Sequence, residues 1–220
     1  MLVSLVFEVN QHNVNKPEFH IQCGFIHPVV RSICKQNDNV VAHSSNKLAM
    51  DDQEASSSRV RPDYRVDMYD TTCSVVSTNM YGGVKPKNIK PVEVLNDFHK
   101  IAIFGKVGLK HSSTGAAMTF RSVDNHVFFY LNYRVANYGF VCLDLGDFEI
   151  PTTKGTLMSI LGSLPLIYKL AYIYNCTCLN RAQVIPDQDN LSGYTTTLSF
   201  SLGKSIISNK DNKKRRSACL

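Results

Sequence analysis

The chain has 220 residues, of which 44% are hydrophobic, and a formal net charge of +6. This length suits one domain with extensions or two small domains, and the apolar content is sufficient for a sizeable core. Residues 204–220 hold six basic residues and one acidic residue, so they carry +5 of the charge and leave +1 for the other 203 residues. The composition therefore excludes a uniformly basic protein and places the positive charge in a tail.

Two further features limit the class of protein. The seven cysteines are odd in number and scattered from Cys23 to Cys219, which is typical of reduced intracellular thiols and not of a disulfide framework. The apolar run Met1–Val9 has no basic residue before it and is too short to span a membrane. It predicts a short strand in place of a signal peptide.

The composition divides the chain into a flexible, partly disordered leader over residues 1–63, a compact sheet-rich domain over 64–203 and a basic tail over 204–220. Residues 1–49 are rich in Asn, His and Gln, and Met50–Arg59 is acidic and then serine-rich. Such a segment resembles a flexible N-terminus, so one hypothesis is that translation starts at Met50.

The first part of the compact domain predicts loops and short elements. An edge strand is expected around Cys73–Thr78, followed by a turn at Tyr81–Val84, where two glycines are adjacent. Two prolines stiffen the basic loop Lys85–Pro91, and Pro91 suits the first turn of a short helix over Val92–His99.

Three runs with strand periodicity come next: Ile101–Lys110, Met118–Val135 and Phe140–Ile150. Apolar residues alternate with other residues in these runs, which is typical of strands with one buried face. The glycines Gly105 and Gly108 fall inside the first run and indicate a twist or bulge site. Lys106 and Lys110 would share its outer face.

The most apolar stretch is Thr153–Asn175, in which Lys169 is the only charge between residues 156 and 174. Gly162 and Pro165 predict a break, so two short helices are expected, Thr153–Leu161 and Leu164–Asn175, packed on the sheet. A membrane-lying hairpin and a membrane span are the alternatives. A half-exposed strand over Tyr194–Leu202 follows. The fold class expected is α+β, a mainly antiparallel sheet with a few short helices on one face.

No catalytic residue, metal site or cofactor is predicted. The chain has no nucleophile elbow, Walker loop or Rossmann glycine pattern. The residues His20, Cys23, His27 and Cys34 are spaced more closely than known zinc-finger ligands. The carboxylates Asp144, Asp147 and Glu149 fit a solvated strand edge better than a metal site.

Basic residues supply the predicted site instead. The expected binding residues for an anionic partner are Lys85, Lys87, Lys90, Lys213, Lys214, Arg215 and Arg216. The last four also resemble a nuclear-import patch, which would allow nuclear entry.

Three segments carry a resemblance to a known family: the basic loop and helix Lys85–Lys100, the aromatic run Val127–Val135 and the apolar stretch Leu157–Tyr174. Together they resemble a small matrix protein of a negative-strand RNA virus, nearest to the plant rhabdovirus type, over Tyr64–Leu202. The Pro-Pro-x-Tyr budding motif of some matrix proteins is absent. The resemblance implies a virion protein that self-associates and contacts the nucleocapsid and the membrane.

The function expected from these features is that of a non-enzymatic structural protein that self-associates and bridges nucleocapsid or RNA to an anionic membrane. One alternative is a viral movement or silencing-suppressor protein that binds nucleic acid non-specifically. Another is an enzyme, which would need a pocket that gathers residues such as His126, Cys142 and Asp144.

Overall fold

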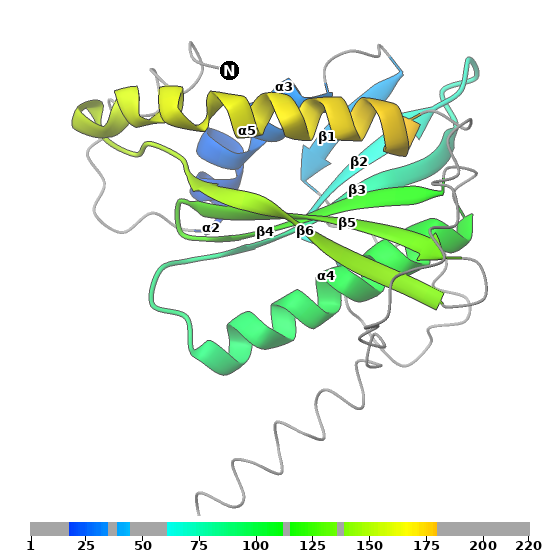
Figure 1. The fold of residues 1–220 in the computed structure, drawn as a ribbon, viewed down its shortest axis with the longest axis horizontal. Coiled ribbons are helices and arrows are strands. Elements are labelled where there is room, and N and C mark those ends of the chain that lie inside the picture. Colours follow the sequence, from blue (N-terminus) through cyan, green and yellow to red (C-terminus); the bar gives the residue numbers. More distant parts are fainter. Residues whose placement is uncertain (1–17, 35–38, 45–60, 112–114, 136–138, 180–220) are drawn as a thin grey trace, which may run out of the picture.

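The computed structural model describes residues 18–34, 39–44, 61–111, 115–135 and 139–179, which form one six-stranded sheet with helices on both faces (Figure 1). The strands are adjacent in chain order: β1 Val40–Ser44, β2 Tyr64–Tyr69, β3 Val75–Lys85, β4 Ala116–Val123, β5 His126–Val135 and β6 Gly139–Glu149. The helical elements are α2 Glu18–His20, η1 Ile21–Ile26, α3 His27–Cys34, α4 Pro91–His111, η2 Lys154–Ser159, α5 Ile160–Ile173 and η3 Tyr174–Leu179.

Neighbouring strands run antiparallel except for β3 and β4, which are parallel and joined by α4. The predicted α+β class with a mainly antiparallel sheet is therefore confirmed. The expectation that all helices share one face is wrong. In Figure 1, α3 and α5 lie above the sheet, whereas α4 lies beneath it. A parallel pair needs a crossover connection, and a helix in that connection has to cover a face.

The main core lies between the sheet and the upper helices. Phe25, Ile26, Val29, Val30 and Ile33 from η1 and α3 are at most 1% exposed, and they pack with residues of α5 and of the central strands. The rings of Tyr64 and Phe120 meet edge-on at 5.6 Å, and those of Phe129 and Phe148 stack at 5.9 Å. This continuous aromatic row fixes the upper layer on β2, β4, β5 and β6.

The expectation of a flexible leader is wrong for its described part. Glu18–Cys34 is helical and largely buried, and Val40–Ser44 is the edge strand β1. The His27 Nδ1 atom lies 2.5 Å from the Tyr64 hydroxyl, which links α3 to β2. The sequence shows only short apolar patches here because the helix is short and buries one face.

Buried charge attaches β1 to the sheet. The Asp67 carboxylate on β2 is fully buried, and it contacts His43 of β1 at 2.7 Å and Arg65 at 2.8 Å. The Thr78 hydroxyl of β3 donates to the same carboxylate at 2.6 Å. Since an unpaired buried carboxylate is costly, these contacts make β1, β2 and β3 mutually dependent.

The strand predicted over Ile101–Lys110 is wrong, because these residues continue the helix that begins at Pro91. The start at Pro91 is confirmed, but α4 is 21 residues long. Ile101, Ile103, Val107 and Leu109 have alternating spacing, whereas the buried Ile101, Phe104 and Leu109 have helical spacing, so the run of apolar residues did not separate the two patterns. The two glycines allow close packing: a Cβ on Gly105 would lie 2.5 Å from Asn132, and one on Gly108 would lie 2.7 Å from Tyr81.

Several strand boundaries also differ from the expectation. Met118–Val135 is two strands, because Asp124 takes a positive φ and turns the chain with Asn125. The run over Phe140–Ile150 is confirmed as β6. The strand expected around Cys73–Thr78 is not an edge: β3 is central and includes the supposed turn at Gly82 and Gly83.

The apolar stretch is one continuous helical segment over η2, α5 and η3, not two helices. Pro165 lies inside α5 and Gly162 does not end it. Because Pro165 is exposed, water can solvate the carbonyl that loses its helical partner. The segment begins at Thr153, whose side chain accepts from the Thr156 amide. The predicted strand Tyr194–Leu202 lies outside the described residues.

We predict that a chain starting at Met50 does not unfold cooperatively. It would lack the nine buried residues of η1 and α3. Burial of the five apolar ones that are at most 1% exposed, at about 1.5–3 kcal/mol each, amounts to about 7–15 kcal/mol, the size of a whole domain's stability. Near-ultraviolet circular dichroism and thermal melting of residues 50–220 and 1–220 make the comparison.

In the full chain, Phe25→Ala should cost about 3–5 kcal/mol, whereas Cys23→Ala, an exposed position on the same helical turn, should cost under about 0.5 kcal/mol. A cooperative melt of the shortened chain at the temperature of the full chain would contradict the prediction.

Candidate interaction surfaces

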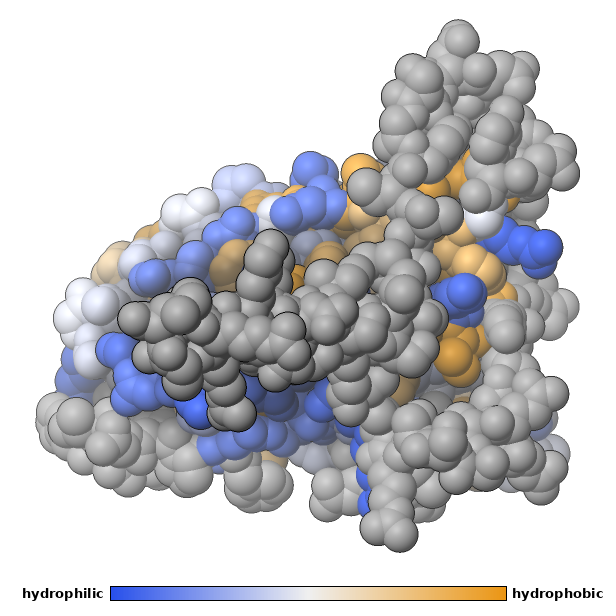
Figure 2. All heavy atoms as spheres, turned by 90° about the horizontal axis from the view of Figure 1, so that it is seen from below, coloured by the Kyte–Doolittle hydropathy of each residue, from blue (hydrophilic) through white to orange (hydrophobic). Residues whose placement is uncertain are grey.

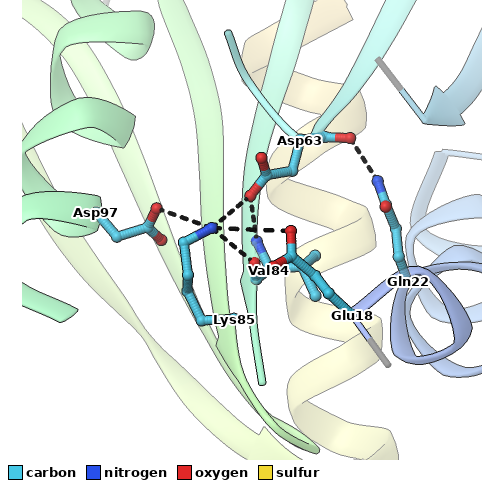
Figure 3. Close-up of polar contacts among 6 residues, drawn as sticks. All are labelled: Glu18, Gln22, Asp63, Val84, Lys85 and Asp97. Carbon is cyan, nitrogen blue, oxygen red and sulfur yellow. Dashed lines mark hydrogen bonds and ion pairs between the residues drawn. The ribbon is translucent and has the colours of Figure 1, made fainter. Parts of the chain in front are cut away.

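Lys85 lies at the end of β3 inside a cluster of three carboxylates (Figure 3). Its Nζ atom is 2.9 Å from Asp63, 3.5 Å from Asp97 and 3.9 Å from Glu18. It also donates to the Val84 carbonyl at 2.8 Å. Asp63 in addition accepts from the Val84 amide at 2.9 Å, and the Gln22 side chain donates to the Asp63 carbonyl. The cluster joins α2, η1, β3 and α4.

The electrostatics of this cluster are those of a structural cation. Burial alone would lower the pKa of Lys85, but Asp97, Asp63 and Glu18 outweigh it and hold the pKa above the usual value. Burial raises the pKa of Asp97, which Lys85 only partly offsets, and the pKa of Glu18 is raised for the same reason. The positive charge of Lys85 is therefore balanced by carboxylates within the protein, and Lys85 does not join a surface for anionic partners.

The other predicted binding residues have different locations. Lys87 and Lys90 are exposed in the loop between β3 and α4, where the Lys90 carbonyl accepts the amides of Glu93 and Val94 and starts α4. Lys213, Lys214, Arg215 and Arg216 lie outside the described residues. The structure thus leaves Lys87 and Lys90 open to a partner and removes Lys85 from the predicted set.

An apolar stripe covers the outer side of the α5 segment. We call these residues the α5 stripe: Met158, Leu161, Leu164, Tyr168 and Tyr172, which are 69%, 44%, 37%, 77% and 63% exposed. Their spacing of three and four residues places them on one side of a helix. The inner side, with Ile160, Ile167, Leu170 and Tyr174, packs on the core. The segment is apolar on both sides.

By length and composition, Lys154–Leu179 is long and apolar enough to cross a membrane, the only such helix among the described residues. In this structure the helix lies across the sheet, and 17% of the residues in its most apolar 18-residue stretch are buried. The predicted packing on the sheet is confirmed for the inner side. The outer side is apolar and exposed, so the alternative of contact with a membrane stays a prediction.

Opposite α5, an arginine–aromatic cluster lies on the α4 face of the sheet: Phe98, Arg121, His126, Phe128 and Tyr130. The Arg121 guanidinium lies 4.5 Å from the centroid of Phe128 and 5.7 Å from that of Phe98, and its Nε donates to the Tyr130 hydroxyl at 3.1 Å. The rings of His126 and Phe128 stack at 4.6 Å. Figure 2, which views this side, shows hydrophilic and hydrophobic residues interspersed.

The sequence pattern did not identify this cluster, although the alternation of β5 places His126, Phe128 and Tyr130 on one face. Arg121 and Phe98 join them from β4 and α4. Arg121 is directly opposite Phe128 in the β4–β5 register, a pairing that needs the turn at Asp124 to be known.

Of the three residues named for the enzyme hypothesis, Cys142 and Asp144 are neighbours on β6, but His126 is not near Cys142. In the β5–β6 register His126 is opposite Glu149, whereas Cys142 is opposite Asn132. Seven residues of strand separate Glu149 from Cys142, about 20 Å. His126 instead contacts Asp147 at 2.5 Å, and burial with the neighbouring Asp144 raises the pKa of Cys142 to about 11.

The residues considered as zinc ligands also have different surroundings. Cys34 is buried, Cys23 is exposed and His27 contacts Tyr64. Within the described ranges, no group of three or more His, Cys, Asp or Glu side chains is arranged to hold a metal ion.

We predict that Lys85→Met destabilises the protein by about 3 kcal/mol at neutral pH, because it leaves partly buried carboxylates without their cation. A carboxyl whose pKa is raised on folding favours the folded state at low pH, and this contribution is lost as pH rises through the raised pKa. Removal of Lys85 raises the Asp97 pKa further, so the deficit should shrink on acidification toward the ordinary pKa of 3.8.

Urea unfolding across this pH range measures the deficit, with exposed Lys87→Met as the matched control. Equal losses in the two variants, or a deficit independent of pH, would show that Lys85 is not the structural cation described here.

Comparison with protein-family models, with curated proteins and with solved structures found no match to this chain.

Proposed function

We propose that the protein is a non-enzymatic structural protein, matrix-like in role, that self-associates and bridges a viral nucleocapsid or RNA to an anionic membrane. The observation that carries the proposal is the exposed α5 stripe. In this proposal the stripe lies in the membrane interface, and the protein acts in the virion and at host membranes.

The chemistry of the α5 segment supports a lipid surface as its partner. Tyr168 and Tyr172 have amphipathic rings, which favour the boundary between lipid headgroups and acyl chains. Lys154 and Lys169 are exposed on the same segment and can reach anionic headgroups. Burial of an apolar side chain contributes about 1.5–3 kcal/mol, so partial insertion of five such residues is sufficient for peripheral binding.

The arrangement of the layers supports a bridging role. The α5 stripe faces away from the sheet on one side, while α4 and the loop with Lys87 and Lys90 lie on the other (Figure 1). A membrane on the α5 side leaves the α4 side accessible to a second, anionic partner.

The alternative function, a movement or silencing-suppressor protein that binds nucleic acid, is favoured by the arginine–aromatic cluster and not by α5. Binding of RNA without any binding of lipid would favour this alternative.

We predict that Leu161→Ser/Tyr168→Ser lowers binding to vesicles of phosphatidylcholine and phosphatidylserine by at least about tenfold. Each substitution removes a side chain worth about 1.5 kcal/mol on insertion. Flotation of vesicles with bound protein measures the effect. The control is Val92→Ser/Leu95→Ser, which changes two apolar residues of α4 that are 39% and 46% exposed. Failure of the unaltered protein to float, or equal losses in both variants, would overturn the membrane role.

The basic tail should add a component that depends on charge. Replacing Lys213, Lys214, Arg215 and Arg216 by Ala should weaken flotation with phosphatidylserine vesicles at low salt, because each basic residue near an anionic surface contributes about 1 kcal/mol. The difference should vanish with phosphatidylcholine alone and at high salt. A loss of equal size on neutral vesicles would contradict an electrostatic contribution.

A further inference from the structure

The arginine–aromatic cluster has partly exposed rings and a guanidinium for which no ion pair with a carboxylate is found among the described residues. Phe98, Arg121, His126 and Phe128 are each partly exposed, whereas Tyr130 is 6% exposed and lies beneath Phe98 with ring centroids 5.2 Å apart. The contacts found for Arg121 are two rings and the Tyr130 hydroxyl. These contacts hold the guanidinium between the two rings and the Tyr130 hydroxyl.

The exposed lysines lie at the same end of the sheet. In the β3–β4 register Gly83 is opposite Arg121 and Lys85 is opposite Val123, and the Asp124 amide donates to the Lys85 carbonyl at 2.8 Å. The loop with Lys87 and Lys90 therefore leaves the sheet where β4 turns into β5, next to His126. The N-terminus of α4 is at this end too, where Glu93 in the first turn offsets the positive end of the helix dipole.

Three carboxylates of β6 lie opposite the cluster in the β5–β6 register: Asp144, Asp147 and Glu149 are opposite Tyr130, Phe128 and His126. Asp147 contacts His126, and the Asp144 carboxylate accepts the Gly146 amide at 2.9 Å. Glu149 is opposite His126 in register and would repel a phosphate from the β6 side. A polyanion is therefore directed to the side of Lys87 and Lys90.

Planar rings beside a line of cations are the features that bind single-stranded nucleic acid without sequence preference. We propose that the arginine–aromatic cluster, with Lys87 and Lys90, is a binding surface for single-stranded nucleic acid. A base stacks on the His126 ring and so extends the stack that His126, Phe128 and Arg121 already form, and phosphates contact Lys87, Lys90 and Arg121. This inference rests on the proposed function, in which RNA is a partner, and names the surface that RNA contacts.

The test uses the full chain and fluorescein-labelled oligouridylate, with oligothymidylate as the second arm, followed by fluorescence anisotropy at several salt concentrations. Lys87→Ala/Lys90→Ala should weaken binding and lower the slope of log affinity against log salt by about 1.4, since each phosphate contact on a single strand contributes about 0.7. Lys154→Ala/Lys169→Ala, a matched pair of exposed lysines on η2 and α5, should leave both quantities unchanged.

Stacking of bases on the cluster is measured separately from the contacts with phosphates. Phe128→Leu should weaken binding about tenfold or more at every salt concentration, and it should reduce the quenching of 2-aminopurine placed in the oligonucleotide. Arg121→Lys keeps the charge and loses the flat guanidinium, so it should reduce the quenching with little change in salt slope. Thermal melting of each variant shows whether the fold is retained.

No binding by the unaltered chain at low salt would overturn the proposal. So would equal losses from the two lysine pairs, or binding unaffected by both Phe128→Leu and Arg121→Lys, since the tail alone would then explain it. In the proposed function, vesicle flotation does not depend on Lys87, Lys90, Arg121 or Phe128. Absence of RNA binding by the unaltered chain, with its flotation retained, therefore rejects this surface alone, whereas absence of flotation rejects the membrane role.

Discussion

The two adjacent glycines of β3 let both helical layers approach one central strand. A Cβ on Gly82 would lie 2.1 Å from the ring of Phe120 on the upper face, and a Cβ on Gly83 would lie 2.5 Å from Asp97 on the lower face. No side chain fits at either position without displacing a neighbour. The Phe120 ring can therefore join the upper aromatic row, and α4 can bring Asp97 within reach of Lys85. The central strand, the crossover helix and the charged cluster all depend on this absence of side chains.

The same pair shows why part of the fold was predictable and part was not. Adjacent glycines are common in turns, and only the ring and the helix packed against them reveal that they lie in a strand. The long alternating run that became β6, and the start of α4 at Pro91, depend on local residues, and both were predicted correctly. The extent of α4 was not, because its apolar residues also alternate and only packing on Tyr81 and Asn132 separates the two periods.

The candidate surfaces can likewise be divided into features that depend on local sequence and features that depend on the packing of distant segments. Charge and composition identified the basic loop, but not the fact that Lys85 is used internally. Its three carboxylate partners come from residues 18, 63 and 97, which are far apart in the chain and carry no shared pattern. The exposed α5 stripe was partly visible in the sequence as an apolar stretch with one charge. The arginine–aromatic cluster was not, because it requires the β4–β5 register that places Arg121 opposite Phe128.

The arrangement of surfaces limits which functions can operate together. The sheet separates the α5 stripe from the arginine–aromatic cluster, so a membrane on one side does not compete for space with a polyanion on the other. The charged cluster at Lys85 lies where the basic loop begins and ties that loop to α2, β3 and α4. Because the ion pairs of Lys85 hold the start of the loop against the sheet and α4, the loop that carries Lys87 and Lys90 begins at a defined position. A partner bound to these lysines therefore contacts a surface whose position relative to α5 is set by the sheet, which is the property that a bridging protein needs.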